Sequence, residues 1–449
     1  MLLALVAVAA FGAARASAAP RAYLGFLDDE SLRWGPTRAA AWSELSAGHA
    51  SVVRTIVDWA QVAPRRPAHA ADPFDPAYRF SDLDDFVRNA QKRGIEVLLT
   101  LWGTPSWANG GGGPNVPPTN ARDFGRFAEA VATRYSGNIA GYPFARFYSI
   151  WNEPNTPRFL RSTDRVRAYA RLASAGYDGV KAVSPDAQVA IGETAASHQP
   201  AAFMEALAAR DPKLKFDAWA HHPYPARPGD SPQLPETWPD VGVQELGRFG
   251  DDVDRAFGRA NTPLWVTEYA ESVPAVSRGR QADDLAYALQ ASVALPRVQM
   301  FVWLMLRNHR QESWQSGLWG TSSWTVFRSE ATAFDPRNAV VSVAAGTSRT
   351  VVQVPALELR YAVPAGASVT VSYSIRARGA PVAAASEAAT MGSDGWVPFV
   401  VHLPRGTDPA TVAVAVRDAS GASLRRTLSV VRRAPSRRSA GSGRPRRPR

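Results

Sequence analysis

The chain of 449 residues contains no cysteine. This excludes disulfide bonds, thiolate metal sites and cysteine nucleophiles, and the cysteine count therefore says nothing about the redox compartment. Beyond the first residues, the sequence also lacks any run apolar enough to span a bilayer.

The one markedly apolar run lies at the N-terminus, over residues 2–11, and is followed by the small residues Ala16, Ser17 and Ala18. This pattern is typical of a secretory signal peptide with a cleavage site, and it predicts a signal over residues 1–19. No Lys or Arg precedes the apolar run. An uncleaved anchor or a misassigned start codon would explain this. We expect the protein to be secreted or associated with the cell envelope.

Basic charge is concentrated at the other end of the chain. The formal net charge is +11, and residues 432–449 contribute eight arginines and no acid, which leaves +3 for the rest. Because the body is nearly neutral, we expect no nucleic-acid partner. The Arg-, Pro- and Ser-rich tail, residues 432–449, is predicted to be disordered; it is either a solvated end or a weak contact for anionic cell-envelope polymers.

Strand and helix patterns alternate regularly after the N-terminal segment, which indicates a parallel sheet. The predicted strands cover residues 23–27, 51–57, 95–101, 147–151, 188–191, 216–220, 264–267 and 298–304. The predicted helices cover residues 36–47, 81–93, 119–135, 163–183, 200–210, 243–259 and 281–295. Eight strands between residues 20 and 335 predict a (β/α)8 TIM barrel. An open doubly wound sheet is the alternative, but residues 24–28 lack its glycine-rich phosphate turn.

The pattern of residues changes after residue 335. Short Val- and Thr-rich runs, broken by Gly, Pro and Asp, replace the helical periodicity, at residues 340–343, 350–354, 368–375, 396–402 and 411–416. This pattern predicts a small all-β accessory domain over residues 336–431, an immunoglobulin-like sandwich.

Two of the predicted barrel strands end in a carboxylate. The apolar run 147–151 stops at Asn152 and Glu153, followed by a proline, and the run 264–267 stops at Glu268. The carboxyl ends of barrel strands share one face, which is where active sites lie. Two carboxylates at that face suggest an acid and a nucleophile working as a pair.

Each of these carboxylates also has a structural interpretation. Glu153 could be an acid at a helix start and Glu268 an ordinary salt-bridge partner. Two competing carboxylates are Glu193, which could line the cleft from the end of the fifth strand, and Glu271, in the loop after the seventh. Both glutamates fall at the carboxyl ends of strands in a pattern of eight, and this favours the catalytic interpretation.

The motifs Trp151-Asn152-Glu153-Pro154 and Trp265-Val266-Thr267-Glu268 resemble the signature of the clan A glycoside hydrolases, and the chain is similar to families 39 and 5 over residues 22–335. The resemblance implies a retaining (β/α)8 enzyme that cleaves a β-glycosidic bond. It implies that Glu153 is the general acid/base and Glu268 the nucleophile.

The resemblance also implies substrate contacts. Asn152 would bond the sugar 2-hydroxyl, and Arg54 would bond the nucleophile, although Arg54 could instead form an ordinary buried ion pair. His222 and Tyr224 would lie beside the nucleophile. The pair His221-His222 could suggest a metal, but two adjacent histidines do not easily share one ion, so we expect no metal site.

Aromatic residues complete the predicted cleft. Trp303 would form the floor under the reacting sugar, or else be an ordinary core residue. Trp102 falls at a strand end, where a flat ring suits the C–H face of a sugar. Further tryptophans fall in loops or at strand ends of the same face: Trp59, Trp107, Trp314 and Trp319.

The sequence therefore predicts a secreted, monomeric glycoside hydrolase that acts without a cofactor on an oligosaccharide or polysaccharide. A transglycosylase on the same barrel is one alternative, because it would keep both glutamates. A non-catalytic carbohydrate-binding protein is another, and the presence of both carboxylates argues against it.

Overall fold

The computed structural model describes residues 21–310, 313–338, 340–344, 348–404 and 410–433. The predicted signal peptide, residues 1–19, lies outside these ranges, as does most of the predicted tail. Within the described part of the chain, no helix is long and apolar enough to cross a membrane.

Eight parallel strands form a closed barrel, in which β1 pairs with both β2 and β8. The strands are β1 (Tyr23–Leu27), β2 (Val52–Asp58), β3 (Glu96–Trp102), β4 (Phe147–Ile150), β5 (Gln188–Ala195), β6 (Ala218–His222), β7 (Leu264–Tyr269) and β8 (Val298–Trp303). They are buried along almost their whole length, as expected for strands covered on the outside by helices and filled on the inside by side chains. The predicted TIM barrel is confirmed.

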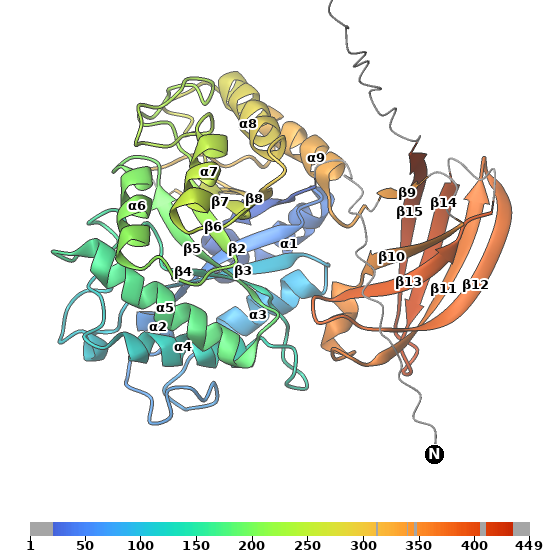
Figure 1. Ribbon diagram of the computed structural model, residues 1–449, viewed down its shortest axis with the longest axis horizontal. Coiled ribbons are helices and arrows are strands. Elements are labelled where there is room, and N and C mark those ends of the chain that lie inside the picture. The colour runs from blue at the N-terminus through green and yellow to red at the C-terminus, as the bar shows by residue number, and fades with distance from the viewer. Residues whose placement is uncertain (1–20, 311–312, 339, 345–347, 405–409, 434–449) are drawn as a thin grey trace, which may run out of the picture.

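Helices surround the barrel (Figure 1). They are α1 (Arg38–Ala47), α2 (Trp59–Val62), α3 (Ser81–Gln91), α4 (Ala121–Arg134), α5 (Arg165–Val183), α6 (Pro200–Arg210), α7 (Leu246–Ala256), α8 (Arg278–Val293) and α9 (Ser322–Phe334). The sequence pattern did not predict α9, which begins inside a Trp- and Ser-rich stretch without a clear polar face. A π-helical turn, η1 (Glu30–Trp34), follows β1, and a 3-10 turn, η2 (Ser106–Ala108), follows β3.

The fifth strand differs from its prediction. It extends four residues beyond Ile191, to Ala195, and its pairing with β6 shifts register between Gly192 and Thr194. Gly192 and Glu193 both have positive φ, 97° and 47°. Such a bulge adds one residue to the strand and changes the direction of a side chain. It directs Glu193 into the barrel, where the side chain is fully buried.

The C-terminal domain is a β-sandwich. Its strands are β9 (Val340–Ala344), β10 (Arg349–Pro355), β11 (Ser368–Ala377), β12 (Ala380–Thr390), β13 (Trp396–His402), β14 (Ala410–Arg417) and β15 (Ser423–Arg433). One sheet has the order β12-β11-β14-β15-β9, and β10 pairs with β13 in the other. Alternating residues of both sheets, such as Val371, Phe399 and Val412, fill the core between them.

One strand of this sandwich was not predicted, whereas β15 completes the hairpin that the pattern of residues 416–422 predicts. β12 is Ala-rich and mostly exposed, so it lacks the alternation of a half-buried strand. β15 includes Arg432 and Arg433, which pair in parallel with Val343 and Ala344 of β9. The predicted start of the tail at residue 432 is therefore wrong, because backbone pairing continues through Arg433.

The sandwich packs against the barrel beside the amino-terminal ends of the strands. Gln91, at the end of α3, donates to the Leu357 carbonyl at 3.4 Å. Arg146, just before β4, lies 3.9 Å from Asp394, and the Arg360 guanidinium lies 4.7 Å from the Phe144 ring centroid. The sandwich therefore adjoins the end of the barrel opposite the mouth formed by the carboxyl ends of the strands.

Candidate active site

The backbone at the end of β4 is strained. Trp151 and Glu153 adopt positive φ, 72° and 44°, a region that non-glycine residues rarely occupy and that clusters at functional sites. Two contacts hold this turn: the Trp151 indole donates to the Phe159 carbonyl at 2.9 Å, and the Glu153 amide donates to the Glu193 carbonyl at 2.9 Å. The turn directs Glu153 into the mouth of the barrel, where its side chain is 16 % exposed.

Glu268, on β7, lies across the mouth and is held at both carboxylate oxygens. The Tyr224 hydroxyl donates to Oε1 at 3.0 Å, and Arg54 Nη1 donates to Oε2 at 2.9 Å. Burial and the nearby Glu268 charge raise the pKa of Tyr224 well above its usual value, so the tyrosine keeps its proton and acts as the donor. The structure thus brings Glu268, Arg54 and Tyr224 together as predicted.

Arg54, on β2, is a fully buried centre of hydrogen bonds at the base of the site. Its Nε donates to Thr100 at 2.9 Å, and its Nη2 donates to the Asn152 amide oxygen at 2.7 Å and to Glu193 at 3.1 Å. The guanidinium therefore links β2 to β3, β4, β5 and β7, and its planar geometry fixes the direction of each partner.

Glu193 is the buried counter-charge of this centre. Its Oε2 also accepts from the Thr267 hydroxyl at 2.6 Å and from His222 Nε2 at 2.8 Å. Burial alone would raise the pKa of Glu193, but the charges of Arg54 and His222 outweigh it and lower the pKa to about 2. Glu193 does not line the cleft, contrary to its interpretation as a cleft carboxylate; it lies beneath it.

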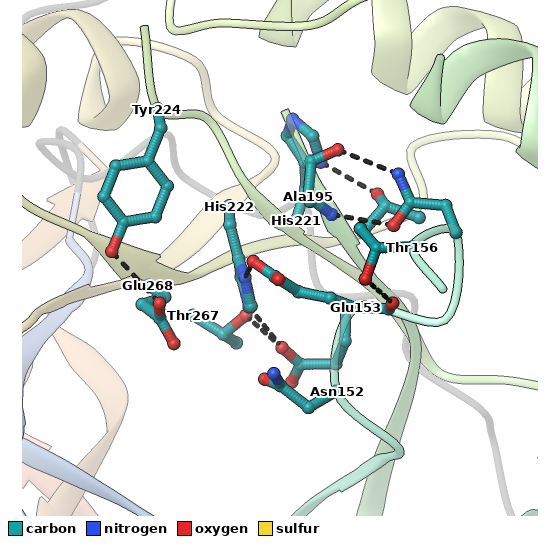
Figure 2. A network of polar contacts seen from close by, with 12 residues as sticks. Asn152, Glu153, Thr156, Ala195, His221, His222, Tyr224, Thr267 and Glu268 are labelled. Atoms are coloured by element: carbon teal, nitrogen blue, oxygen red, sulfur yellow. Dashed lines mark hydrogen bonds and ion pairs between the residues drawn. The ribbon is translucent and has the colours of Figure 1, made fainter. Parts of the chain in front are cut away.

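His222, on β6, connects Glu193 to Glu153. Its Nδ1 lies 3.0 Å from Glu153 Oε1 (Figure 2), whereas its other ring nitrogen, Nε2, faces Glu193. Burial would lower the pKa of His222, but the carboxylates of Glu268, Glu153 and Glu193 raise it to about 9. At neutral pH the imidazole is therefore a cation, with one ring N–H directed to Glu153 and the other to Glu193.

His221 faces away from the site. Its Nδ1 lies 2.8 Å from the Thr194 hydroxyl and its Nε2 lies 2.9 Å from the Val241 carbonyl. Burial lowers the pKa of His221 to about 3, so this imidazole is neutral. Consecutive residues of a strand point to opposite sides, and the two histidines cannot share one ion.

Within the described ranges, one group of side chains has the spacing of a metal site: ligand atoms of Glu153, His222 and Glu268 lie within 4.8 Å of one another. His222 is a poor ligand here, because both of its nitrogens face carboxylates as donors and its pKa of about 9 keeps it protonated. A metal would have to displace that proton. The arrangement suits proton transfer better than metal binding.

An open cleft of about 1700 Å³ covers the mouth of the barrel. Glu153, Glu268, Tyr224 and Trp102 line it. Of the other predicted tryptophans, Trp314 lines the cleft too, while the remaining three do not: Trp59, Trp107 and Trp319.

Trp303 does not form the floor of the cleft, and that prediction is wrong. Its side chain is fully buried, packs edge-on to Tyr269 and donates from its indole nitrogen to the Ser316 carbonyl at 2.9 Å. The next residue, Leu304, lines the cleft in its place. Because successive side chains of a strand point to opposite sides, only one of Trp303 and Leu304 can face the cleft, and the sequence alone did not show which.

Glu271 also lines the cleft, although its side chain is almost wholly buried. The Tyr269 hydroxyl donates to one of its oxygens at 2.9 Å, and burial raises the pKa of Glu271 to about 7. The competing carboxylate noted in the sequence is therefore a third titratable group of the cleft.

A closed (β/α)8 barrel with paired glutamates at the ends of β4 and β7 defines a glycoside hydrolase of the clan A type. The chain belongs to glycosyl hydrolase family 5, because the family's cellulase model matches residues 21–307. A comparison with curated proteins finds no match.

Solved structures share the fold. A family 39 glycoside hydrolase from Bacteroides cellulosilyticus WH2 superposes with a TM-score of 0.54 and 17% identity, over 85% of this chain and 80% of that one. A GH5_18 protein from Streptomyces cattleya, in complex with GlcNAc, superposes with a TM-score of 0.51 and 15% identity, over 73% of this chain and 86% of that one.

Proposed function

We propose that this chain is a retaining glycosidase that cleaves a β-glycosidic bond by double displacement. The observation that carries the proposal is the approach of the two cleft glutamates, whose nearest ligand oxygens lie within 4.8 Å of each other. Retaining enzymes place their carboxyl groups about 5–5.5 Å apart, whereas inverting enzymes leave about 6.5–9.5 Å for a water molecule.

In the first step Glu268 attacks the anomeric carbon and forms a glycosyl ester, while Glu153 gives its proton to the leaving oxygen. In the second step Glu153 takes a proton from water, which attacks the anomeric carbon; the bond from that carbon to Glu268 breaks, and the carboxylate leaves. Arg54 and Tyr224 hold the Glu268 carboxylate through one hydrogen bond to each oxygen. They support its role as an ionised nucleophile aimed at the sugar.

His222 positions the acid/base residue. As a cation it donates to Glu153 on one side and to Glu193, which is ionised at neutral pH, on the other. Asn152 gives its amide oxygen to Arg54, so its NH₂ group is left to donate to the sugar 2-hydroxyl. Trp102 and Tyr224 offer rings on the cleft wall for the faces of the sugar.

The substrate in this proposal is a β-linked oligosaccharide or polysaccharide, which the cellulase family match supports. The apolar segment at residues 2–11 supports export of the enzyme, so that it meets such glycans outside the cytoplasm.

Azide rescue tests the two roles. We expect Glu153→Ala and Glu268→Ala each to lose most activity on aryl β-glycosides. Azide should restore turnover in both, giving a β-glycosyl azide with Glu153→Ala and an α-glycosyl azide with Glu268→Ala. The same azide anomer from both variants would contradict the assignment, and transfer to sugar acceptors in preference to water would identify a transglycosylase.

A further inference from the structure

The strand order divides the mouth of the barrel into two unequal arcs. Glu153 on β4 and Glu268 on β7 are separated by β5 and β6 on one side and by β8, β1, β2 and β3 on the other. When the scissile glycosidic bond lies between the two carboxylates, the sugars on one side of it lie over one arc and those on the other side lie over the other arc. The two arcs therefore contact different parts of the substrate.

The side chains of the two arcs differ. Small side chains and prolines predominate on the cleft lining after β5 and β6, including Ala196, Ser197, Pro225 and Ala226. The lining after β1 and β2 is charged and carries Trp34, whose side chain is 54 % exposed. Among the described residues, Trp34 is the only large exposed hydrophobic side chain that lines the cleft.

Trp34 lies beside two charged side chains, Arg33 and Asp82, which are hydrogen-bonded to each other. The Arg33 guanidinium is 5.1 Å from the Trp34 ring centroid and is buried, donating to Thr55 at 2.8 Å, to the Ile56 carbonyl at 2.9 Å and to Asp82 at 2.6 Å. The Trp34 indole nitrogen also faces Asp82, at 3.4 Å. Partial burial would raise the pKa of Asp82, but Arg33 outweighs it and lowers the pKa, so the carboxylate stays charged.

We infer that Trp34 and Asp82 form a distal sugar subsite, which binds a pyranose ring at least one unit away from the scissile bond on the β1–β2 side. An exposed indole offers a flat apolar surface for the C–H face of a sugar. The adjoining carboxylate, held in place by Arg33, accepts hydrogen bonds from the hydroxyls at the ring edge. This inference rests on the proposed glycosidase function, and it makes an oligosaccharide, rather than a monoglycoside, the preferred substrate.

The test compares substrates of different length. For wild type, kcat/KM should rise from aryl β-glycosides to β-1,4-linked gluco-, manno- or xylo-oligosaccharides of three to six units. In Trp34→Ala the loss should be about tenfold larger for the oligosaccharide than for the aryl glycoside, and should appear mainly in KM. Trp34→Phe, which keeps a flat ring, should recover most of the loss.

Trp319→Ala is the matched control, because Trp319 is also exposed, at 39 %, but lies outside the cleft lining. It should match wild type on every length. An equal loss on all lengths in Trp34→Ala would overturn the subsite.

A binding measurement separates this inference from the proposed function. Calorimetry of the same oligosaccharides with Glu268→Gln, with and without Trp34→Ala, requires no turnover. An inactive wild type would refute the glycosidase proposal, yet a length-dependent affinity that needs Trp34 would still support the subsite. If Trp34→Ala leaves the affinity unchanged for the gluco-, manno- and xylo-oligosaccharides alike, the distal subsite is refuted.

Discussion

The carboxylate of Glu193 balances two buried cations, Arg54 and His222, below the cleft. Replacing it with glutamine keeps the shape but removes the charge. The difference between its pKa of about 2 and the usual 4.5 corresponds to about 3 kcal/mol of stability at neutral pH. Removing one partner of a buried ion pair typically costs a similar amount, about 3–5 kcal/mol. We therefore expect Glu193→Gln to lower the free energy of unfolding by about 3 kcal/mol at pH 7.

The pH dependence of this loss identifies its cause. Because the pKa of Glu193 is lowered on folding, its contribution is present above pH 4.5 and is lost as the pH falls through 2. The difference between wild type and Glu193→Gln, measured by urea denaturation, should shrink to about half or less between pH 7 and pH 3.

Glu205→Gln is the control, because Glu205 is exposed on α6 and its replacement should change stability by less than about 0.5 kcal/mol. A loss below about 1 kcal/mol for Glu193→Gln at pH 7, or a difference that does not depend on pH, would refute the charge argument.

Two further predictions follow from the site. The pKa of His222 is raised from 6.5 to about 9, so its contribution to stability is fully present below pH 6.5 and is lost as the pH rises through 9. In urea denaturation, wild type should lose stability between pH 6.5 and 9, and His222→Gln should not. Parallel pH curves for the two proteins would contradict a cationic imidazole. Trp303→Phe should lower the free energy of unfolding by about 1–3 kcal/mol, because it shrinks a fully buried side chain and removes the shorter of the two hydrogen bonds to the Ser316 carbonyl, leaving that from Gln281 at 3.4 Å. It should leave KM unchanged, and a raised KM with unchanged stability would place Trp303 in the cleft.

Several features of the site were predictable because they depend on local pattern. Apolar runs that end in Asn152-Glu153 and in Glu268 mark strand ends, and the carboxyl ends of barrel strands always share one face. The contacts of Arg54 and Tyr224 with Glu268 followed from the family resemblance, and the structure places both at hydrogen-bonding distance.

Other features depend on register and could not be predicted. Its position at the end of the fifth strand made Glu193 a candidate for the cleft lining, but the bulge at Gly192 directs its side chain into the barrel. Trp303 and Leu304 are neighbours, and the phase of β8 decides which one faces the sugar. A shift of one residue exchanges the two faces of a strand, so such assignments need the paired neighbour.

The order of strands and helices, the all-β character of the C-terminal domain and the two glutamates could be predicted, because they depend on periodicity and on residues adjacent in the chain. Which charges meet depends on the closed barrel. Arg54, Glu193 and His222 are separated by up to 168 positions, yet their polar atoms lie within 3.5 Å of one another. The protonation states of the site are set by these distances, and closure of the barrel is what brings the side chains together.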